Sequence, residues 1–569
     1  MDSSKVDHVG VTSQEKEAYM HLEIAKHQLV DGVDISRLAE EALPFKSKAA
    51  FRLAIVTFVW GLSVLAFAVD LAVMGSMAAM PHFKEFYQTD STGGRWGLII
   101  SIASVGGVVG SWTLWISDII GRRGCCCLGS IILAIGCAIQ ASAPNTSGLV
   151  AGRFVAGMGS SFCATIGPAY MAEVSPSVYR GLAVGMYCSC YQIGAIMIAA
   201  LVFGTSYIDS DAQFRIPMIF QVGPPLLVAA LVYPCTPESP RWLVSKGRVD
   251  QAREIIARYQ TVSGDVNSPI VNEQINQIES SLDLLKSKPW DYTVFLKTAA
   301  GRYRLWVIAL YSFFQQWNGG GLINSYLPGI LELVGINSPA QQLGLNLGIS
   351  LIYVVKNQGR STDLFSFLPG LTITSWLSTM AGAVFVDRLP RRTILLVNLI
   401  IFIFLLILAG IFNALYSNDI SKAAMGYLLI VTIFCFNVAT GLFLNVLHNM
   451  YPGENLHYTQ RAKGMGLYSF FQSAFGFAMT YGSAAALETL GWKIYFLYVG
   501  INLVTMVLIY HSCPEFRWLS LEETDLIFET PTAKSNFASF PSQQVQISVK
   551  LEKAKVEQRR QQRDGQRDA

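Results

Sequence analysis

The amino-acid sequence predicts an all-α membrane protein with twelve transmembrane helices in two pseudo-symmetric six-helix bundles. Three observations support this. Apolar residues make up 52% of the 569-residue chain and charged residues only 14%, whereas soluble domains have about a quarter of their residues charged. Several apolar runs are long enough to cross a bilayer, and similar charged patterns occur at matching places in the two halves. The net charge of +3 gives no reason to expect a nucleic-acid partner.

The expected membrane helices are runs of about 20 mostly apolar residues, the length that crosses the hydrocarbon core. A polar stretch over 236–302 divides them into two groups of six. The spans are expected at 51–75, 95–116, 125–143, 148–171, 181–205 and 216–235, then at 303–333, 371–386, 393–415, 424–450, 462–486 and 491–511. The corresponding domains are a tail over 1–50, a bundle over 51–236, a loop with short helices over 237–302, a bundle over 303–512 and a tail over 513–569.

Basic residues in the short loops predict the orientation, because cytoplasmic loops are enriched in Lys and Arg. The loops after the even-numbered spans contain Arg122, Arg123, Arg180, Arg391, Arg392 and Arg461. These loops, both termini and the 237–302 loop are therefore expected on the cytoplasmic side, in a multi-pass protein of the plasma membrane. The ten cysteines show no spacing typical of disulfides or zinc sites, so neither a metal nor a cofactor is expected. The sequence gives no indication of oligomeric state.

The segment 350–374 does not fit a continuous eighth span. It contains the polar block Lys356-Asn357-Gln358-Gly359-Arg360-Ser361-Thr362-Asp363 between two apolar stretches. Joining Ile349 directly to Ser375 would restore an amphipathic membrane helix. We interpret the segment as an atypical insertion, and an intron left in the gene model is the alternative. A transcript that encodes the block intact would exclude the intron.

One acid lies four residues ahead of an arginine pair in each half. Asp118 precedes Arg122 and Arg123, and Asp387 precedes Arg391 and Arg392. Guanidinium groups can bind carboxylates and carbonyls on neighbouring spans, so we predict a cytoplasmic gate. Topology marking by positive charge is the alternative. Further acids end each half or follow spans 4 and 10, with basic residues near them, and they complete the predicted gate: Glu173, Arg180, Glu238, Arg241, Glu454, Arg461 and Glu515.

Further motifs carry a resemblance to a known family. They are Arg153-Phe154-Val155-Ala156-Gly157-Met158-Gly159 in span 4, Gln315-Gln316-Trp317 in span 7, and Tyr451-Pro452-Gly453-Glu454 followed by Arg461-Ala462-Lys463-Gly464-Met465. With the repeated acid and arginine patterns, they resemble the sugar porter family of the major facilitator superfamily over about residues 51–525. The last motif is most similar to that of fungal lactose and oligosaccharide permeases. The resemblance implies a secondary active transporter that works by alternating access and is not an enzyme.

Asp70 lies inside span 1, and Arg153 lies near the start of span 4. A carboxylate inside a membrane helix costs on the order of 2.5–3.5 kcal/mol on insertion scales, so it needs a partner or a purpose. The resemblance implies that these two residues form the proton site, in which protonation of Asp70 releases Arg153. The alternatives are a structural salt bridge and an Asp70 that faces water at the end of its span.

Span 7 is the predicted substrate site. Sugars present many hydroxyl groups, which neutral amides and aromatic faces can bind. The candidates are Gln315, Gln316, Asn318, Asn324 and Tyr326, and they surround three glycines that weaken the helix. A broken helix is tolerated in a membrane only where it lines a cavity. Gln192 in span 5 and Asn445 in span 10 are weaker candidates, and amides that only pack between helices are the alternative for all of them.

The predicted function is import of a hexose or a disaccharide, such as lactose or cellobiose, by proton symport. The predicted partners are therefore a sugar, protons and the lipid bilayer. A sugar sensor that transports weakly or not at all is one alternative. A carrier of another neutral polyhydroxy solute, such as a polyol or quinate, is another.

Overall fold

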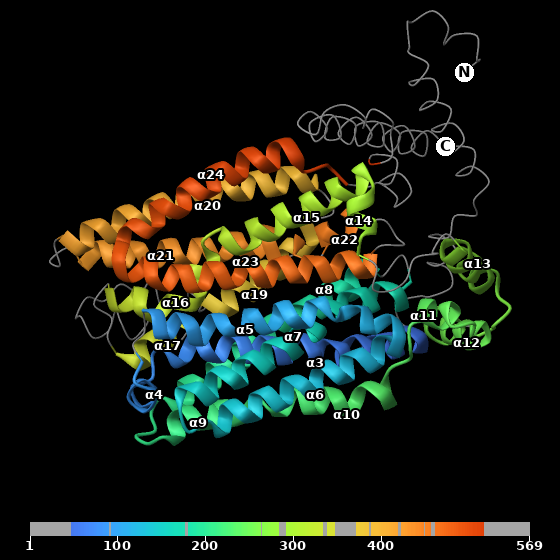
Figure 1. Cartoon of the computed structure of the whole chain (residues 1–569), viewed down its shortest axis with the longest axis horizontal. Helices are drawn as coiled ribbons and strands as arrows, with labels where there is room; N and C mark the ends of the chain where they lie inside the picture. Colours follow the sequence, from blue (N-terminus) through green and yellow to red (C-terminus); the bar gives the residue numbers. More distant parts are fainter. Residues whose placement is uncertain are drawn as a thin grey trace, which may run out of the picture.

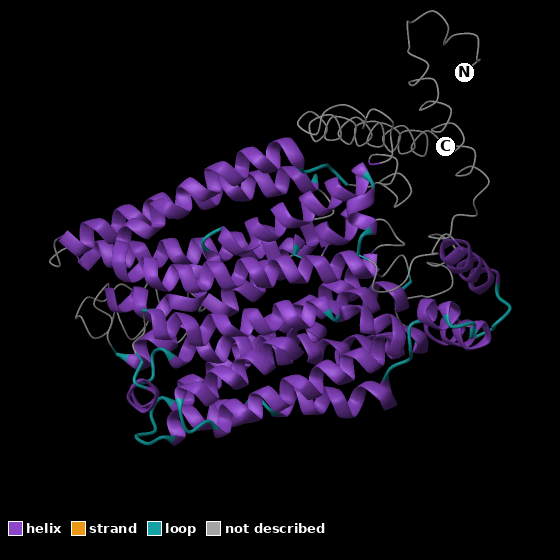
Figure 2. Cartoon of the chain, in the orientation of Figure 1, coloured by secondary structure: helices purple, strands orange, loops and turns teal. Residues whose placement is uncertain are grey.

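The computed structural model describes residues 47–89, 93–176, 180–262, 264–283, 292–333, 338–347, 371–385, 389–418, 423–445, 447–448, 450–456, 461–516 and 528. Within these ranges the regular structure is helical, with short connections at the helix ends (Figure 2). The predicted insertion and both predicted tails lie largely outside the described residues, as does Asp387.

The helices of the N-terminal half lie together in the lower part of Figure 1. They are α3 (Lys48–Met77), α4 (Pro81–Tyr87), α5 (Gly94–Trp112), the 3-10 turn η2 (Leu114–Ile116), α6 (Ser117–Ser142), α7 (Thr146–Val174), α8 (Arg180–Thr205), α9 (Ala212–Phe220) and α10 (Gly223–Cys235). Side-chain caps define two of the starts, because the Ser47 and Asn145 side chains accept backbone N–H groups of α3 and α7.

The helices of the C-terminal half lie mostly above them in the same view. They are α15 (Ala299–Trp317), α16 (Gly320–Leu333), α17 (Pro339–Leu347), α19 (Leu371–Phe385), α20 (Arg391–Asn418), α21 (Ala423–Ala439), the π-helical turn η5 (Thr440–Asn445), α22 (Met450–Asn455), α23 (Arg461–Leu490), the 3-10 turn η7 (Gly491–Lys493) and α24 (Ile494–Ser512). Between the halves, α11 (Pro240–Ser245), α12 (Val249–Gln260) and α13 (Pro269–Asp283) project at one end of the bundles, and α14 (Val294–Lys297) precedes α15 (Figure 1).

Nine stretches of the described chain are long and apolar enough to cross a membrane. The last of them, Lys463–Ser512, joins two expected spans through η7. The expected spans that are missing from the nine are the seventh and the eighth. The seventh is divided into α15 and α16, and the eighth is described only from Leu371. The helical membrane fold predicted from the sequence is confirmed.

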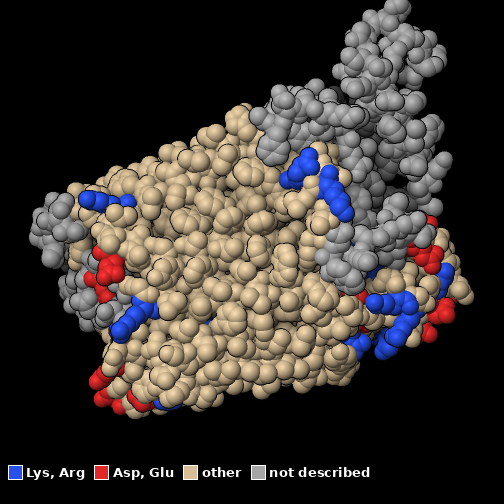
Figure 3. Space-filling view, viewed as in Figure 1, with Lys and Arg blue, Asp and Glu red and all other residues tan. Residues whose placement is uncertain are grey.

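Charge is distributed as a bilayer requires. On the face shown in Figure 3, Lys, Arg, Asp and Glu side chains gather at the two ends of the molecule, and the broad middle band is free of them. The projecting helices α11 to α13 lie at one of these ends (Figure 1). A band without charge avoids the cost of placing ions in hydrocarbon.

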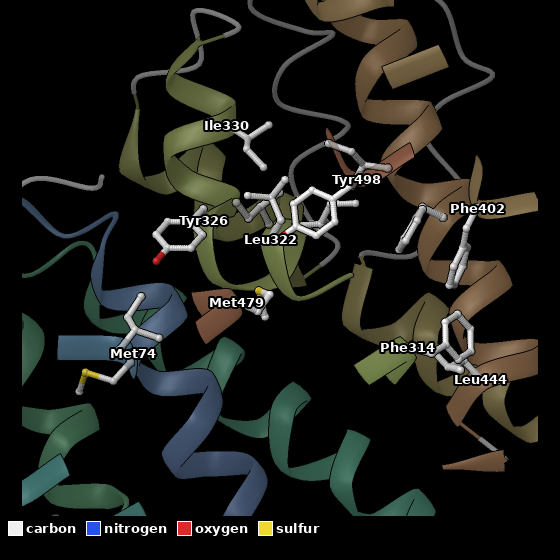
Figure 4. Close-up of a cluster of buried hydrophobic side chains, with 14 of the residues drawn as sticks. Met74, Phe314, Leu322, Tyr326, Ile330, Phe402, Leu444, Met479 and Tyr498 are labelled. Atoms are coloured by element: carbon white, nitrogen blue, oxygen red, sulfur yellow. The ribbon is translucent and has the colours of Figure 1, made fainter. Parts of the chain in front are cut away.

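The two halves pack through helices that carry the predicted site residues. Across α5 and α23, Ser111 Oγ donates to Ser469 Oγ at 2.8 Å. Figure 4 shows that the buried apolar cluster includes Met74 of α3, Tyr326 of α16 and Met479 of α23, so one hydrophobic core extends over both halves. The substrate candidates of the C-terminal half therefore lie close to helices of the N-terminal half.

Candidate functional site

Asp70 and Arg153 form an ion pair inside the N-terminal bundle. Arg153 Nη1 lies 3.1 Å from Asp70 Oδ1, and the side chains are 0% and 4% exposed. The same nitrogen donates to the backbone carbonyl of Asp70 at 3.2 Å. Gln140, which is also fully buried, donates from Nε2 to Asp70 Oδ1 at 3.3 Å. The alternative in which Asp70 faces water at the end of its span does not agree with this burial.

Part of the hydrogen-bonding capacity around this pair is unused. Among the described residues, Arg153 Nε, Arg153 Nη2 and Gln140 Oε1 are buried and have no hydrogen-bond partner. Both side-chain amide atoms of Gln221, at the break between α9 and α10, are likewise buried and without a hydrogen-bond partner. Unsatisfied buried polar groups are costly in a packed core. The pair therefore has donors and an acceptor beside it that could take a further hydrogen-bond partner.

The break in the seventh span is built by Asn318 and Gly319. Gly319 has φ +103°, a left-handed conformation that glycine adopts at little cost. Asn318 caps the break on both sides, since its Nδ2 donates to the Gln315 carbonyl at 2.6 Å and its Oδ1 accepts from the Gly320 N–H at 2.7 Å. The predicted interruption of the helix by its glycines is confirmed.

Gln315 belongs to a chain of hydrogen bonds that links α15 to the end of the tenth span. Its Nε2 donates to the Tyr311 hydroxyl at 2.8 Å, and that hydroxyl donates to the Leu447 carbonyl at 2.9 Å. Its Oε1 lies 3.3 Å from His448 Nδ1. Both Gln315 and His448 are partly exposed.

Gln316 belongs to a second chain, which links α15 to α23. Its Nε2 donates to Gln472 Oε1. Gln472 Nε2 donates to the Tyr468 hydroxyl at 2.7 Å, and this hydroxyl donates to the His448 carbonyl at 2.7 Å. The predicted pair of glutamines therefore forms the centre of a larger polar network in the C-terminal half.

The other substrate candidates occupy different surroundings. Gln192 Nε2 donates across the halves to Ser375 Oγ at 3.2 Å, and Asn445 Nδ2 donates to Thr379 Oγ1, one turn further along α19, at 3.2 Å. Tyr326 is fully buried and donates to the Thr480 carbonyl at 2.6 Å. Asn324 is exposed at the contact between α16 and α3. Gln192 therefore contacts α19 across the interface, and Asn445 contacts the same helix from within the C-terminal half.

The predicted gate residues of the N-terminal half form one cluster around Arg122. The guanidinium holds Glu173 with two bonds of 3.2 Å and Asp118 at 2.8 Å. Glu238 accepts the backbone N–H of Arg122 at 3.0 Å and that of Arg123 at 3.4 Å. Burial raises the pKa of Glu238, and these backbone donors oppose the increase. The cluster ties the ends of α6 and α7 to the segment that precedes α11.

The C-terminal half repeats this arrangement. Glu515 accepts the backbone N–H groups of Arg391 at 2.8 Å and Arg392 at 2.9 Å. Arg391 Nη2 lies 3.6 Å from Glu454 Oε1. Each cluster also has a tyrosine that donates to the carbonyl of the proline before its glutamate. Tyr170 donates to the Pro237 carbonyl at 2.6 Å, and Tyr451 donates to the Pro514 carbonyl at 3.1 Å. The sequence repeat thus corresponds to a repeated structural unit.

The bonds named in both clusters lie within one half. They connect helices of the same bundle and do not cross the interface. Arg241 lies in α11, directly after Glu238 and Ser239-Pro240. The side chains of Arg180 and Arg461 lie outside the described part of the structure, together with Asp387. The named bonds therefore hold helices of one half to one another.

Gly121→Ala is expected to destabilise the N-terminal cluster. Gly121 has φ +87°, and an added Cβ would lie 2.5 Å from Glu238 Oε2. Strain from this backbone conformation and displacement of Glu238 should together cost about 1–3 kcal/mol. Gly124→Ala is the matched control, because its Cβ would meet only ordinary contacts at 3.4 Å. Thermal unfolding in detergent should show a lower Tm for Gly121→Ala alone, and equal Tm values for the two variants would contradict the assignment.

Several site residues were not predicted from the sequence. Gln140 is a neutral residue near the end of an apolar span, and nothing in its neighbourhood marks it. Tyr311, one helical turn before Gln315, could have been found from that spacing. His448 is also absent from the predicted site residues, but its ring lies 3.3 Å from Gln315 Oε1 and its carbonyl accepts from the Tyr468 hydroxyl. Within the described residues, no group of three His, Cys, Asp or Glu side chains could hold a metal ion.

Comparisons with known proteins agree with this architecture. The family described as "Sugar (and other) transporter" matches residues 56–528. The high-affinity glucose transporter of Kluyveromyces lactis is 26% identical over 501 residues, which cover 84% of this chain and 85% of that protein. The quinate permease of Neurospora terricola is 24% identical over 482 residues, which cover 81% and 85%.

Solved structures show the same fold. The proton:xylose symporter XylE bound to 6-bromo-6-deoxy-D-glucose matches with a TM-score of 0.67 at 17% identity, covering 84% of this chain and 100% of that one. A partially occluded inward-open conformation of XylE from E. coli matches with a TM-score of 0.63. The chain belongs to the sugar transporter family of the major facilitator superfamily, and it is a multi-pass membrane transporter rather than an enzyme.

Proposed function

We propose that this protein imports a neutral sugar together with a proton across the plasma membrane, with both termini in the cytoplasm. The observation that supports this best is the buried pair of Asp70 and Arg153 in one half, combined with a polar amide network in the other. The first can hold a proton within the bilayer, and the second offers donors and acceptors to hydroxyl groups. A proton symporter needs both a proton site and a substrate site in one protein.

Asp70 is the proposed proton acceptor. Protonation of the carboxylate would remove the charge that holds Arg153 Nη1 at 3.1 Å and would weaken the bond from Gln140. Asp70 and Arg153 would then separate more easily, since the Coulombic attraction between carboxylate and guanidinium would be lost. The unused donors of Arg153 allow it to take another partner after release.

Helix α3 offers a path from Asp70 to the substrate site. Five residues after Asp70, a Cβ at Gly75 would lie 3.2 Å from the Asn324 carbonyl of α16, so these helices approach closely. On another side, a Cβ at Gly194 of α8 would lie 2.7 Å from the Leu65 carbonyl of α3. Helix α8 carries Gln192, and α16 follows Gln315 and Gln316 after the break. A shift of α3 on protonation would therefore reach both parts of the proposed sugar site.

Uptake measurements in cells that lack their own sugar carriers test the function. Labelled D-glucose and labelled lactose should be screened, each with unlabelled sugars as competitors. We expect saturable accumulation of at least one of the two sugars, and an uncoupler that dissipates the proton gradient should abolish it. A protein that reaches the membrane but accumulates neither sugar would contradict the proposal. If deletion of the tail over 530–569 then removed a cellular response to sugar, the sensor alternative would be supported.

A further inference from the structure

Two hydrogen-bond chains in the C-terminal half run in the same direction and end on neighbouring backbone carbonyls. In the first, Gln315 donates to Tyr311, which donates to the Leu447 carbonyl. In the second, Gln472 donates to Tyr468, which donates to the His448 carbonyl. Each tyrosine hydroxyl donates its single proton to a carbonyl, so it can only accept the hydrogen bond that it forms with its glutamine.

The local backbone explains why these carbonyls are available. The α-helical part of the tenth span ends at Ala439 and continues as the π-helical turn η5 up to Asn445. In a continuous α-helix, the His448 carbonyl would accept the N–H of residue 452, but that residue is Pro452 and has no N–H. The carbonyl is therefore left for the Tyr468 hydroxyl, which satisfies it at 2.7 Å.

The direction of the first chain determines the protonation of the His448 ring. Because Gln315 Nε2 is the donor to Tyr311, Gln315 Oε1 must be the atom that faces His448 Nδ1 at 3.3 Å. An amide oxygen only accepts, so Nδ1 carries a proton. In the neutral ring the other nitrogen, Nε2, then has a free lone pair. No ion pair in the described structure involves His448, so nothing there favours the charged ring.

The imidazole of His448 is partly buried, and its Nε2 has no hydrogen-bond partner among the described residues. The network around it reaches the interface between the halves. A Cβ at Gly476 would lie 3.3 Å from Gln316 Oε1 and 3.6 Å from Ser104 Oγ of α5. Ser469, one position after Tyr468, contacts Ser111 of α5. The ring therefore belongs to a polar network whose other members reach the interface between the halves.

We infer that His448 is a specificity-determining residue, whose Nε2 accepts a hydrogen bond from a hydroxyl group of the substrate. This inference rests on the proposed sugar transport and narrows its substrate class. A hydroxyl can donate to Nε2, whereas a carboxylate has only acceptor atoms and would be repelled by the lone pair. The site thus favours a hydroxyl group over a carboxylate at this position of the substrate.

A matched pair of substitutions tests the role of Nε2. His448→Gln places an amide oxygen near the position of Nε2, whereas His448→Asn retains a donor near Nδ1 but does not reach that position. We expect KM for the transported sugar, D-glucose or lactose, to rise about tenfold in His448→Asn with kcat within about twofold. In His448→Gln, KM should stay within about threefold of the wild-type value.

Monodeoxy analogues of the same sugar distinguish a substrate contact from a structural role. In the wild-type protein, one analogue should bind about tenfold more weakly because it lacks the hydroxyl that donates to Nε2. In His448→Asn, the analogue and the parent sugar should bind equally. An unchanged KM in His448→Asn would overturn the inference, while sugar uptake itself would still support the proposed function. If neither sugar is transported, the proposed function fails first.

Discussion

Arg153→Leu is expected to destabilise the protein by about 3–5 kcal/mol. The substitution removes the partner of a buried carboxylate and leaves Asp70 Oδ1 with the Gln140 amide at 3.3 Å and the Cys137 thiol at 4.0 Å. Breaking a buried ion pair from one side is strongly destabilising, because the other charge stays in a medium that does not solvate it. We expect a lower Tm in detergent and a reduced amount of folded protein in the membrane.

Two further variants separate the charge effect from lost packing. The double variant with Asp70→Asn and Arg153→Leu has no uncompensated charge, so it should recover most of the lost stability. Arg95→Leu makes the same chemical change at an exposed site and should leave Tm nearly unchanged. If the double variant melted as low as Arg153→Leu alone, packing of the arginine rather than its charge would explain the loss.

Asp70→Asn is expected to abolish accumulation of sugar against a gradient while leaving exchange of sugar across the membrane. The amide has nearly the same size as the carboxylic acid but cannot gain or lose a proton in the physiological range. It therefore resembles protonated Asp70 permanently and cannot couple the proton gradient to transport. Counterflow, in which labelled sugar enters in exchange for unlabelled sugar, should continue at a rate within about tenfold of wild type.

The comparison of net uptake and counterflow is the decisive part of that experiment. Asp118→Asn is a suitable control, because Asp118 pairs with Arg122 and does not belong to the proposed proton site. It should retain uptake that an uncoupler abolishes. Accumulation of sugar by Asp70→Asn at the wild-type level would exclude Asp70 as the coupling residue.

The sequence predicts best those features that follow from the cost of charge in a membrane. The pairing of Asp70 with Arg153 could be expected because two isolated charges in apolar spans must find each other or water. The break after Asn318 could be expected from three consecutive glycines. Both features depend on residue type more than on precise packing, and both are present in the structure.

Other features depend on geometry that a sequence does not contain. Gln140 contacts Asp70 only because α6 crosses α7 closely, with Gly152 packed against the Gln140 side chain. Similarly, His448 becomes part of the polar network because the tenth span ends in a π-helical turn before Pro452. Residue type also did not indicate that the bonds of the arginine clusters would lie within each half. These arrangements are set by helix crossings and by the angle at which each helix ends.

The central claim is that sugar and protons move together, and proton movement can be measured directly. Purified protein should be reconstituted into liposomes that contain a pH-sensitive dye, without an imposed gradient, and the transported sugar should then be added outside. The account predicts that addition of sugar acidifies the interior of liposomes with wild-type protein, and that liposomes with Asp70→Asn protein show no pH change although labelled sugar still enters. Entry of sugar into wild-type liposomes with no proton movement would contradict the account.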